Sequence, residues 1–404
     1  MEYKMKTVNL VYDKNAVSLS VSCSNEYVPY LSVFLESIKQ NADAKRNYDI
    51  VVFERSISEE NKLKLCNRYN SNNMCLRFFN PSDYFKGKDL FVSRASFKEE
   101  CYYRIAAPLI FKDYKKILFT DVDLVFDKDP ALIYDIDTNN SEIAAVKDPI
   151  MSGYYKSDYK TEVYLKNVLC MSEPLEYLNT GVMLFNVEPY TKHKLFYKIL
   201  EHCMKNHFKL QEQDGISSLL AHRVFKLPII CNYTPYNKEW SSDNIIDYMP
   251  ENVQKEYISA NGKAIIYHWA GESAKPWFYP EEVLADIWWQ YARQTPFYEE
   301  ILARLIDFKA SKAQENISAV SDLRAEFAKV HFPNINNRFG AGEYNAKLSF
   351  VMNHLLHFRL KKFGYALKKA FAFGERYAKY NDKYQKTKQL IKDAKKLKKS
   401  YYKV

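Results

Sequence analysis

The first 120 residues alternate short apolar segments with amphipathic ones, and this alternation restricts the chain to a small set of folds. Four apolar segments have the length of strands: Val17–Cys23, Tyr48–Glu54, Met74–Phe79 and Lys115–Thr120. Three segments between them carry apolar residues at helical spacing: residues 27–41, 59–69 and 99–111. Strands that alternate with helices predict an α/β fold, with a mostly parallel sheet and helices on both of its faces.

The pattern changes after Asp123, where irregular connections separate the apolar segments. Four more strands are expected: Glu142–Asp148, Tyr177–Val187, Val224–Cys231 and Ala264–Ala270. From Glu281 to about His331 the pattern is helical, and residues 331–345, rich in Asn, Gly and Pro, break it. This break is the best candidate for a linker. With 404 residues, the chain can hold one large α/β domain with an appendage, or two modest domains.

The formal net charge of +10 is concentrated at the C-terminal end. Residues 353–404 carry 16 Lys and Arg against three acids, a net charge of +13, so the remaining residues sum to about −3. Seven scattered cysteines, never spaced C-x-x-C, predict free thiols in a reducing compartment and no zinc ribbon. The N-terminus does not resemble a signal peptide, and no run approaches the ~18 apolar residues of a membrane span. We therefore expect a cytosolic protein.

Two carboxylates, Asp121 and Asp123, directly follow the apolar segment Lys115–Thr120. They can form a solvated turn, which is our interpretation of Asp127 and Asp129. Alternatively, Asp121 can be a nucleophile, as in haloacid-dehalogenase-like phosphatases, although in that fold the motif normally ends the first strand of the domain. The pair can also hold Mn²⁺ or Mg²⁺ on a nucleotide diphosphate. Ligands of open parallel sheets bind beyond the carboxyl ends of strands, which suits a site here.

A second motif favours the metal interpretation. The segment "AIIYHWAGESAKPW", residues 264–277, places His268 at a strand end, then a glycine turn, and then Lys275 before Pro-Trp. Together with the Asp-x-Asp motif, this segment resembles glycosyltransferase family 8, the retaining transferases that include bacterial lipopolysaccharide galactosyl- and glucosyltransferases. The resemblance covers about Val17 to Tyr279. It implies a GT-A fold, which we assign to residues 1–280. The residue patterns and the charge predict a helical continuation and linker over 281–340 and a basic amphipathic tail over 341–404.

The resemblance also implies a UDP-sugar donor, UDP-galactose or UDP-glucose, and Mn²⁺ or Mg²⁺ as cofactor. By motif match the metal ligands would be Asp121, Asp123 and His268. Two carboxylates and a neutral imidazole would leave coordination positions open for two phosphate oxygens. The same match implies these donor-binding residues: Ser22, Ser24, Tyr27, Arg104, Asp121, Val122, Asp123, Asn179, Thr180, Asp214, Gly271 and Lys275. Three residues separate Gly271 from Lys275, whereas the family usually has two.

The family match further implies which residues lie at the reacting centre. In "QEQDGISSLL", Gln213 would lie beside the anomeric carbon, flanked by Glu212 and Asp214 as ligands of sugar hydroxyls. The expected catalytic residues are Gln213, Asp148, Glu212 and Asn179. Because an amide is a poor nucleophile, we expect substitution on the same face through an oxocarbenium-like state. Asp148 and Glu212 remain alternative nucleophiles.

The C-terminal tail offers the only indication of the acceptor. Five apolar residues repeat there at helical spacing with lysines among them: Leu356, Leu360, Phe363, Leu367 and Phe371. This pattern predicts a basic amphipathic helix on an anionic membrane surface, although a helix packed on the main domain would show it too. Nucleic-acid binding is a third possibility that no recognised module supports, so we expect no nucleic-acid partner.

Taken as a whole, the sequence predicts a metal-dependent retaining glycosyltransferase that moves galactose or glucose from its UDP-sugar to a glycan or glycolipid, such as lipopolysaccharide. The expected location is the cytoplasm, peripherally attached to the inner face of the membrane. Two alternatives belong to other classes of protein. One is a phosphatase that uses Asp121, and the other is a non-catalytic basic adaptor for membranes or nucleic acid.

Overall fold

The computed structural model describes residues 5–92, 99–236, 245–271, 275–331, 381–386 and 388, and side chains of the last long helix as far as residue 314. The chain divides into two compact units, Met1–Lys309 and Ala310–Val404. The expected linker, apart from residue 331, lies outside the described residues. So does the expected amphipathic helix of the tail. No helix in the described ranges is long and apolar enough to cross a membrane.

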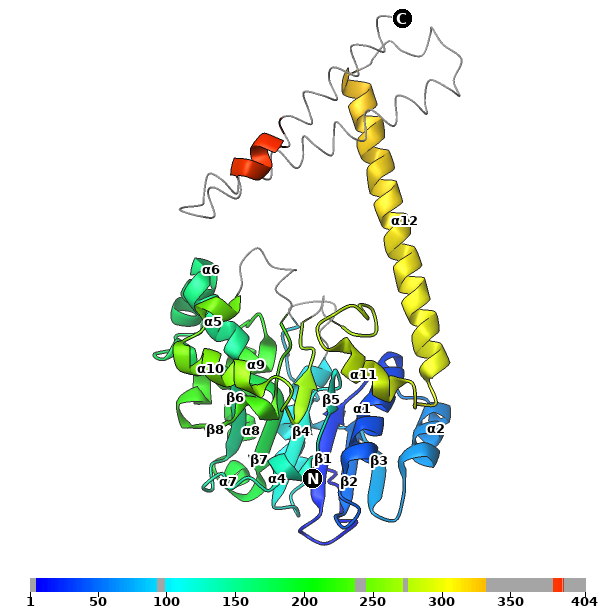
Figure 1. The fold of residues 1–404 in the computed structure, drawn as a ribbon. Coiled ribbons are helices and arrows are strands. Elements are labelled where there is room, and N and C mark those ends of the chain that lie inside the picture. The colour runs from blue at the N-terminus through cyan, green and yellow to red at the C-terminus, as the bar shows by residue number, and fades with distance from the viewer. Residues whose placement is uncertain are drawn as a thin grey trace, which may run out of the picture. The chain divides into compact units, whose positions relative to one another are not determined.

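A seven-stranded sheet, in the order β3-β2-β1-β4-β7-β6-β8, forms the centre of the first unit (Figure 1). Its strands are β1 (Val17–Ser22), β2 (Tyr48–Phe53), β3 (Met74–Phe79), β4 (Lys116–Thr120), β6 (Ile143–Lys147), β7 (Leu178–Asn186) and β8 (Phe225–Leu227). All neighbouring pairs are parallel except those of β7, which runs antiparallel to both β4 and β6. The sequence-based prediction of a mostly parallel sheet is confirmed.

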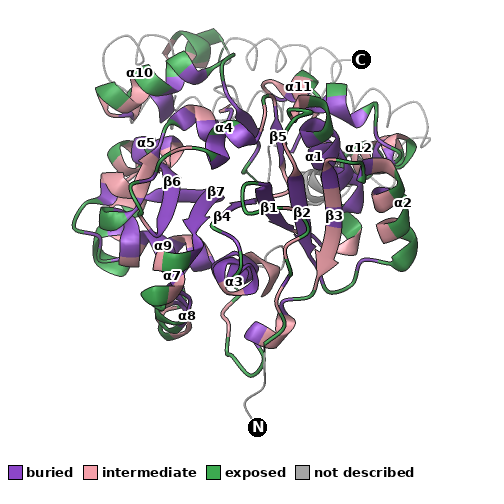
Figure 2. Cartoon of the chain, turned by 90° about the horizontal axis from the view of Figure 1, so that it is seen from below, coloured by how far each residue is buried: buried purple, intermediate pink, exposed green. Residues whose placement is uncertain are grey.

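Helices cover both faces of this sheet, as Figure 2 shows by the buried strands between two layers of helices with exposed outer surfaces. One face packs against α1 (Val28–Asn41), α2 (Glu59–Tyr69), α4 (Ala131–Tyr134), α10 (Glu251–Ala260), α11 (Ala285–Ala292) and the start of α12 (Tyr298–His331). The other packs against α3 (Tyr103–Ile110), α7 (Val187–Lys192), α8 (Leu195–Lys205) and α9 (Gln211–Leu220). Two short helices, α5 (Pro149–Ser157) and α6 (Tyr159–Val163), follow β6.

Burial on both faces explains why the strands read as continuous apolar runs. Along β2, Ile50 and Val52 enter one hydrophobic core, and Val51 and Phe53 enter the other. This is the alternation that a strand's two-residue period requires. The start of α2 also follows from local sequence. The Ser58 side chain accepts a hydrogen bond from the backbone N–H of Asn61 and caps the helix.

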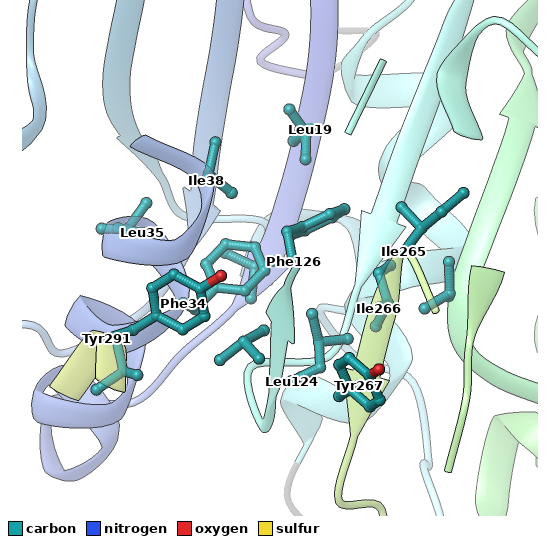
Figure 3. Close-up of a cluster of buried hydrophobic side chains, with 14 of the residues drawn as sticks. Leu19, Phe34, Leu35, Ile38, Leu124, Phe126, Ile265, Ile266, Tyr267 and Tyr291 are labelled. Carbon is teal, nitrogen blue, oxygen red and sulfur yellow. The ribbon is translucent and has the colours of Figure 1, made fainter. Parts of the chain in front are cut away.

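Two strands differ from expectation. The apolar run from Val224 forms a strand only as far as Leu227, since Pro228 has no N–H to donate, and a 3₁₀ turn follows. The sequence did not predict β5 (Leu124–Phe126), which pairs antiparallel with β9 (Ile266–His268) in a separate small sheet. Figure 3 shows the apolar side chains of β5 between those of α1 and those of β9. The ring centroids of Phe34 in α1 and Phe126 in β5 are 5.9 Å apart.

All seven cysteines lie within the described ranges, and all are free thiols, as predicted. Trp277, which follows the Lys-Pro pair, has a structural position. Its ring is buried and stacks on Tyr30, with the centroids 4.1 Å apart. This stack holds the segment after β9 against α1.

Candidate functional site

Two strand pairings bring the acidic motif and His268 together. The backbone N–H of Asp121 donates to the carbonyl of Gly181 (2.8 Å), which joins the end of β4 to β7. Beyond it, Leu124 pairs with His268 in the β5–β9 sheet. The ligand atoms of Asp121, Asp123 and His268 consequently lie within 4.8 Å of one another, although Asp123 and His268 are 145 residues apart in the chain.

This cluster has the chemistry of a divalent-cation site. His268 Nε2 lies 3.1 Å from Asp123 Oδ1 and 3.8 Å from Asp121 Oδ2. Two carboxylates and one imidazole suit ions such as Mn²⁺. The Lys275 ammonium also contacts Asp123, and it donates to the carbonyl of Trp269 at 2.7 Å. Burial alone would raise the pKa of Asp123, but Lys275 and His268 outweigh burial and hold it well below the ordinary range, so the carboxylate is ionised.

Arg104, from α3, connects the acidic motif to α9. Its guanidinium forms ion pairs with Asp121 Oδ1 (2.6 Å) and Glu212 Oε1 (3.1 Å), and it donates to the carbonyl of Thr180. Burial raises the pKa of Glu212 to about 7, against the opposing effect of Arg104. Oε2 of Glu212 is buried and has no hydrogen-bond partner within the described ranges.

The carboxamide of Gln213 is held in one orientation. Its Oε1 accepts from the backbone N–H (3.1 Å) and the hydroxyl (3.2 Å) of Thr180, and its Nε2 donates to the Tyr177 hydroxyl (3.2 Å). The backbone N–H of Thr180 can donate to Gln213 because the pairing of β6 with β7 shifts register at this point. Tyr177 in turn donates to Asp214, so the orientation of Gln213 depends on a buried polar network.

A second network leads from Asp148 to His268. Asp148 directly follows β6 and caps α5, and its Oδ2 accepts from Asn179 Nδ2 at 3.2 Å. Asn179 Oδ1 accepts from Asn232 Nδ2, and Asn232 Oδ1 lies against His268 Nδ1, both at 2.9 Å. Asn232 was not predicted from the sequence. It lies in a turn after β8 and carries no motif that marks it.

A cavity of about 630 Å³ contains this cluster and most of the predicted residues. The predicted residues that line it are Ser22, Ser24, Tyr27, Arg104, Asp121, Val122, Asp123, Asp148, Asn179, Thr180, Glu212, Gln213, His268 and Gly271. Others that sequence reasoning missed also line it, among them Ile150, Met151, Tyr154, Thr234 and Tyr236. Their part of the wall comes from α5 and the turn after β8, where the sequence shows no motif.

Two predicted donor-binding residues do not line the cavity. Asp214 is fully buried, and its carboxylate accepts from the hydroxyls of Tyr164 (2.6 Å) and Tyr177 (2.5 Å) and from the N–H of Leu210 (2.8 Å). These contacts hold the carboxylate in the interior, and its expected contact with a sugar stays a prediction. The Lys275 ammonium is held by its contacts with the Asp123 carboxylate and the carbonyl of Trp269.

Known proteins are similar to this chain in sequence. A family model described as "Glycosyl transferase family 8" matches residues 18–281. A Haemophilus influenzae protein named "Putative glycosyltransferase" is 27% identical over 241 residues, 58% of this chain and 66% of that protein. General stress protein A of Bacillus subtilis is 22% identical over 280 residues, 65% of this chain and 88% of that protein.

Solved structures give a consistent result. The apo structure of the WbbM bifunctional glycosyltransferase superposes with a TM-score of 0.66 at 28% identity, over 74% of this chain and 53% of that one. The galactosyltransferase LgtC, solved with donor and acceptor sugar analogs, gives 0.57 at 19% identity over 69% and 96%, a likeness of fold alone. The matches span less than two thirds of WbbM and of the Haemophilus protein. The family model covers well over half of the length of this chain. This chain therefore belongs to glycosyltransferase family 8 and has a GT-A fold.

Proposed function

We propose that this protein is a metal-dependent retaining glycosyltransferase that moves galactose or glucose from its UDP-sugar to a glycan acceptor. The observation that carries the proposal is the meeting of Asp121, Asp123 and His268 inside a cavity that also contains Arg104 and Glu212. These three ligands fit Mn²⁺ or Mg²⁺. When bound, such an ion would offset the negative charge that develops on the leaving diphosphate.

The nucleoside would bind where β1 ends. Ser22, Ser24 and Tyr27 line the cavity there, and the Ser22 hydroxyl is buried with no hydrogen-bond partner in the described part of the chain. A buried polar atom of this kind favours a ligand that supplies the missing partner. Val122 and Gly271 line the same cavity. Lys275 would exchange its contact with Asp123 for the diphosphate.

The donor sugar would lie against Arg104, Asp148, Asn179 and Glu212. The unsatisfied Oε2 of Glu212 supports this position, because a sugar hydroxyl can donate to it. The same oxygen would otherwise remain buried without compensation.

Same-face substitution fits the surroundings of Gln213. Its amide oxygen accepts two hydrogen bonds from Thr180, and an amide is already a poor nucleophile. The bond from the anomeric carbon to the diphosphate oxygen would break as the acceptor hydroxyl attacks from the same face. The proton of that hydroxyl would pass to the departing phosphate oxygen. Both oxygens of Asp148 are engaged, by Met151 and Asn179, which makes this carboxylate a weaker candidate for a covalent intermediate.

We further propose that the acceptor is a surface glycan or glycolipid, such as lipopolysaccharide, met at the inner face of the membrane. The support is the sequence of the tail, with its net charge of +13 over residues 353–404. Family membership favours glycosyl transfer over the phosphatase and adaptor interpretations, neither of which receives independent support.

The decisive experiment measures metal-dependent hydrolysis across a panel of UDP-sugars, with thermal shift by UDP and Mn²⁺ in parallel. Wild-type protein should hydrolyse one of the UDP-sugars, and this hydrolysis should require Mn²⁺ or Mg²⁺. Asp123→Ala and Asp123→Asn should abolish hydrolysis, because the site loses a ligand and the core is untouched. Asp127→Asn is the matched control, since Asp127 hydrogen-bonds Tyr291 outside the cavity. Wild-type turnover in Asp123→Ala would disprove the metal site.

A further inference from the structure

We infer that Asn179 and Asn232 fix a proton on Nδ1 of His268, so that Nε2 is the ring nitrogen that faces the metal site. Asn232 is therefore a positioning residue for the metal ligand. The inference rests on the proposed metal site, but the proton on Nδ1 follows from contacts of the protein without metal.

The two ring nitrogens of His268 have different neighbours. Nε2 lies beside the carboxylates of Asp123 and Asp121, and Nδ1 lies 2.9 Å from Asn232 Oδ1. His268 and Asn232 are each only 1% exposed, so bulk water does not compete for these contacts. Distances alone do not locate the proton, because an amide and an imidazole can each be reversed. The direction of the hydrogen bonds has to come from a group that can act in only one way.

The backbone N–H of Gly181 is that group, because it can donate and never accept. It lies 3.0 Å from the side-chain atom Oδ1 of Asn179, so that atom must be the oxygen. The group of Asn232 that lies 2.9 Å from the same oxygen must then be the NH₂ end. The other end of Asn232 is consequently an oxygen, which can only accept. His268 Nδ1, facing that oxygen, must carry a proton.

The far end of the network agrees with this direction. The NH₂ group of Asn179 donates to Asp148 Oδ2 at 3.2 Å, and the other oxygen of Asp148 accepts from the N–H of Met151 at 2.8 Å. Reversing both amides would turn an NH₂ group toward the Gly181 N–H, donor against donor, in a buried place. One arrangement therefore satisfies every member from Asp148 to Nδ1 of His268, and in it Nε2 is the ring nitrogen that faces the carboxylates of the metal site.

This arrangement has a measurable consequence for metal affinity. A ring that carried its proton on Nε2 would have to lose or move it before binding a cation. Groups that orient a histidine ligand from its other nitrogen typically contribute about 10–100-fold to metal affinity. Asn232, 36 residues from His268 in the chain, has the position of such a group.

The first test is direct and needs no variant in the network. Full-length protein is labelled with ¹⁵N-histidine, stripped of metal with a chelator and studied by NMR at about pH 8.5, well above the ordinary histidine pKa. His268→Gln identifies the His268 signals by their loss. We expect a proton on Nδ1, both in a neutral ring and in a ring that also carries a proton on Nε2. An Nε2–H tautomer in the wild-type protein overturns the inference outright.

The second test uses three variants and measures Mn²⁺ binding by titration calorimetry together with the tautomer. Asn232→Leu removes the acceptor and should weaken Mn²⁺ binding about tenfold or more. Asn232→Asp keeps an acceptor against Nδ1 and should keep the proton there, although it loses the donor to Asn179 Oδ1. Asn186→Leu is the control, because Asn186 is a buried amide at the other end of β7, bonded to Thr138.

The outcomes separate this inference from the proposed function. Asn232→Leu with wild-type tautomer and Mn²⁺ affinity contradicts the inference, and so does an equal loss in Asn186→Leu. If Asn232→Leu fails to fold, Asn232→Asp decides, and an Nε2–H tautomer in it contradicts the inference. Absence of Mn²⁺ binding by the wild-type protein would refute the proposed metal site, while the NMR result would still decide the tautomer.

Discussion

Gly181 provides the space that the His268 imidazole occupies. A Cβ atom added at Gly181 would collide with Cε1 of His268, and it would lie 2.8 Å from Nδ1 and 3.0 Å from Asn179 Oδ1. Strand β7 therefore leaves room for the imidazole because Gly181 has no side chain. The glycine in "YLNTGVMLFN" is required by this approach and not by a left-handed backbone, since its φ is not positive.

Gly181→Ala should displace the imidazole from Asp121 and Asp123. We expect Mn²⁺ affinity to fall about tenfold or more, and the free energy of unfolding to fall by about 1–3 kcal/mol from overpacking. Titration calorimetry and urea unfolding measure the two effects. Gly87→Ala is the control, because Gly87 has a φ of 73° and open space around it. It should lose stability but keep Mn²⁺ affinity. Wild-type affinity in Gly181→Ala would contradict the steric explanation.

Glu212 should make stability depend on pH. Burial, opposed by Arg104, raises its pKa from 4.5 to about 7. Between these values the folded protein binds more protons than the unfolded chain, so the contribution of Glu212 falls as pH rises through this window and is constant above it. The free energy of unfolding of Glu212→Gln should therefore rise by about 2–3 kcal/mol relative to that of wild type as the pH increases from about 5 to about 8.

Urea unfolding at both pH values measures this difference. Glu299→Gln, an exposed carboxylate at the start of α12, is the control and should show no such gain. A constant difference between Glu212→Gln and wild type across the window would mean that Glu212 ionises as it does in the unfolded chain.

Lys275 should affect the nucleotide more than the metal. Its ammonium pairs with Asp123 and thereby competes with a cation for that carboxylate. Lys275→Met should bind Mn²⁺ at least as tightly as wild type, but bind UDP about tenfold or more weakly in saturating Mn²⁺, since a charge that would face the diphosphate is lost. Titration with each ligand measures both constants. Lys309→Met, which breaks an exposed pair with Glu281, is the control. Unchanged UDP affinity in Lys275→Met would exclude Lys275 from the donor site.

Gln213→Glu should slow the reaction. The new carboxylate oxygen would face the Tyr177 hydroxyl, whose hydrogen is already donated to Asp214. The side chain would reorient, and we expect turnover to fall about 10–100-fold. Steady-state transfer assays and intact-protein mass spectrometry provide the measurement. Faster turnover with a kinetically competent glycosyl-enzyme adduct would instead support double displacement.

Deletion of residues 353–404 tests the proposed membrane attachment. Each Lys or Arg near an anionic surface contributes about 1 kcal/mol, and salt screens this attraction. The truncated protein should no longer sediment with anionic vesicles at low salt, while hydrolysis of a soluble donor stays nearly intact. Transfer to an acceptor embedded in the membrane should fall much further than transfer to a soluble one. Equal sedimentation of the full-length and truncated proteins would exclude the tail as the anchor.

Much of the fold is encoded locally and could be predicted. The runs Tyr48–Phe53 and Lys116–Thr120 are mostly apolar because helices cover both faces of their strands, and this pattern is visible without a structure. The cap at Ser58 is equally local. Asp121, Asp123 and His268 could be picked out because their strand-end positions and residue types match a metal site in a known family.

The tertiary structure decided how these residues meet. The strand β5 has three residues and pairs with β9, whose residues lie more than a hundred positions away, so no local periodicity reveals it. Asp214, next to Gln213 in the sequence, turns away from the cavity because two tyrosine hydroxyls bind it in the interior. The space at Gly181 and the amide of Asn232 serve His268 through contacts between distant segments. Hydrogen-bond direction and steric fit exist only once those segments are packed together, and a sequence pattern records neither.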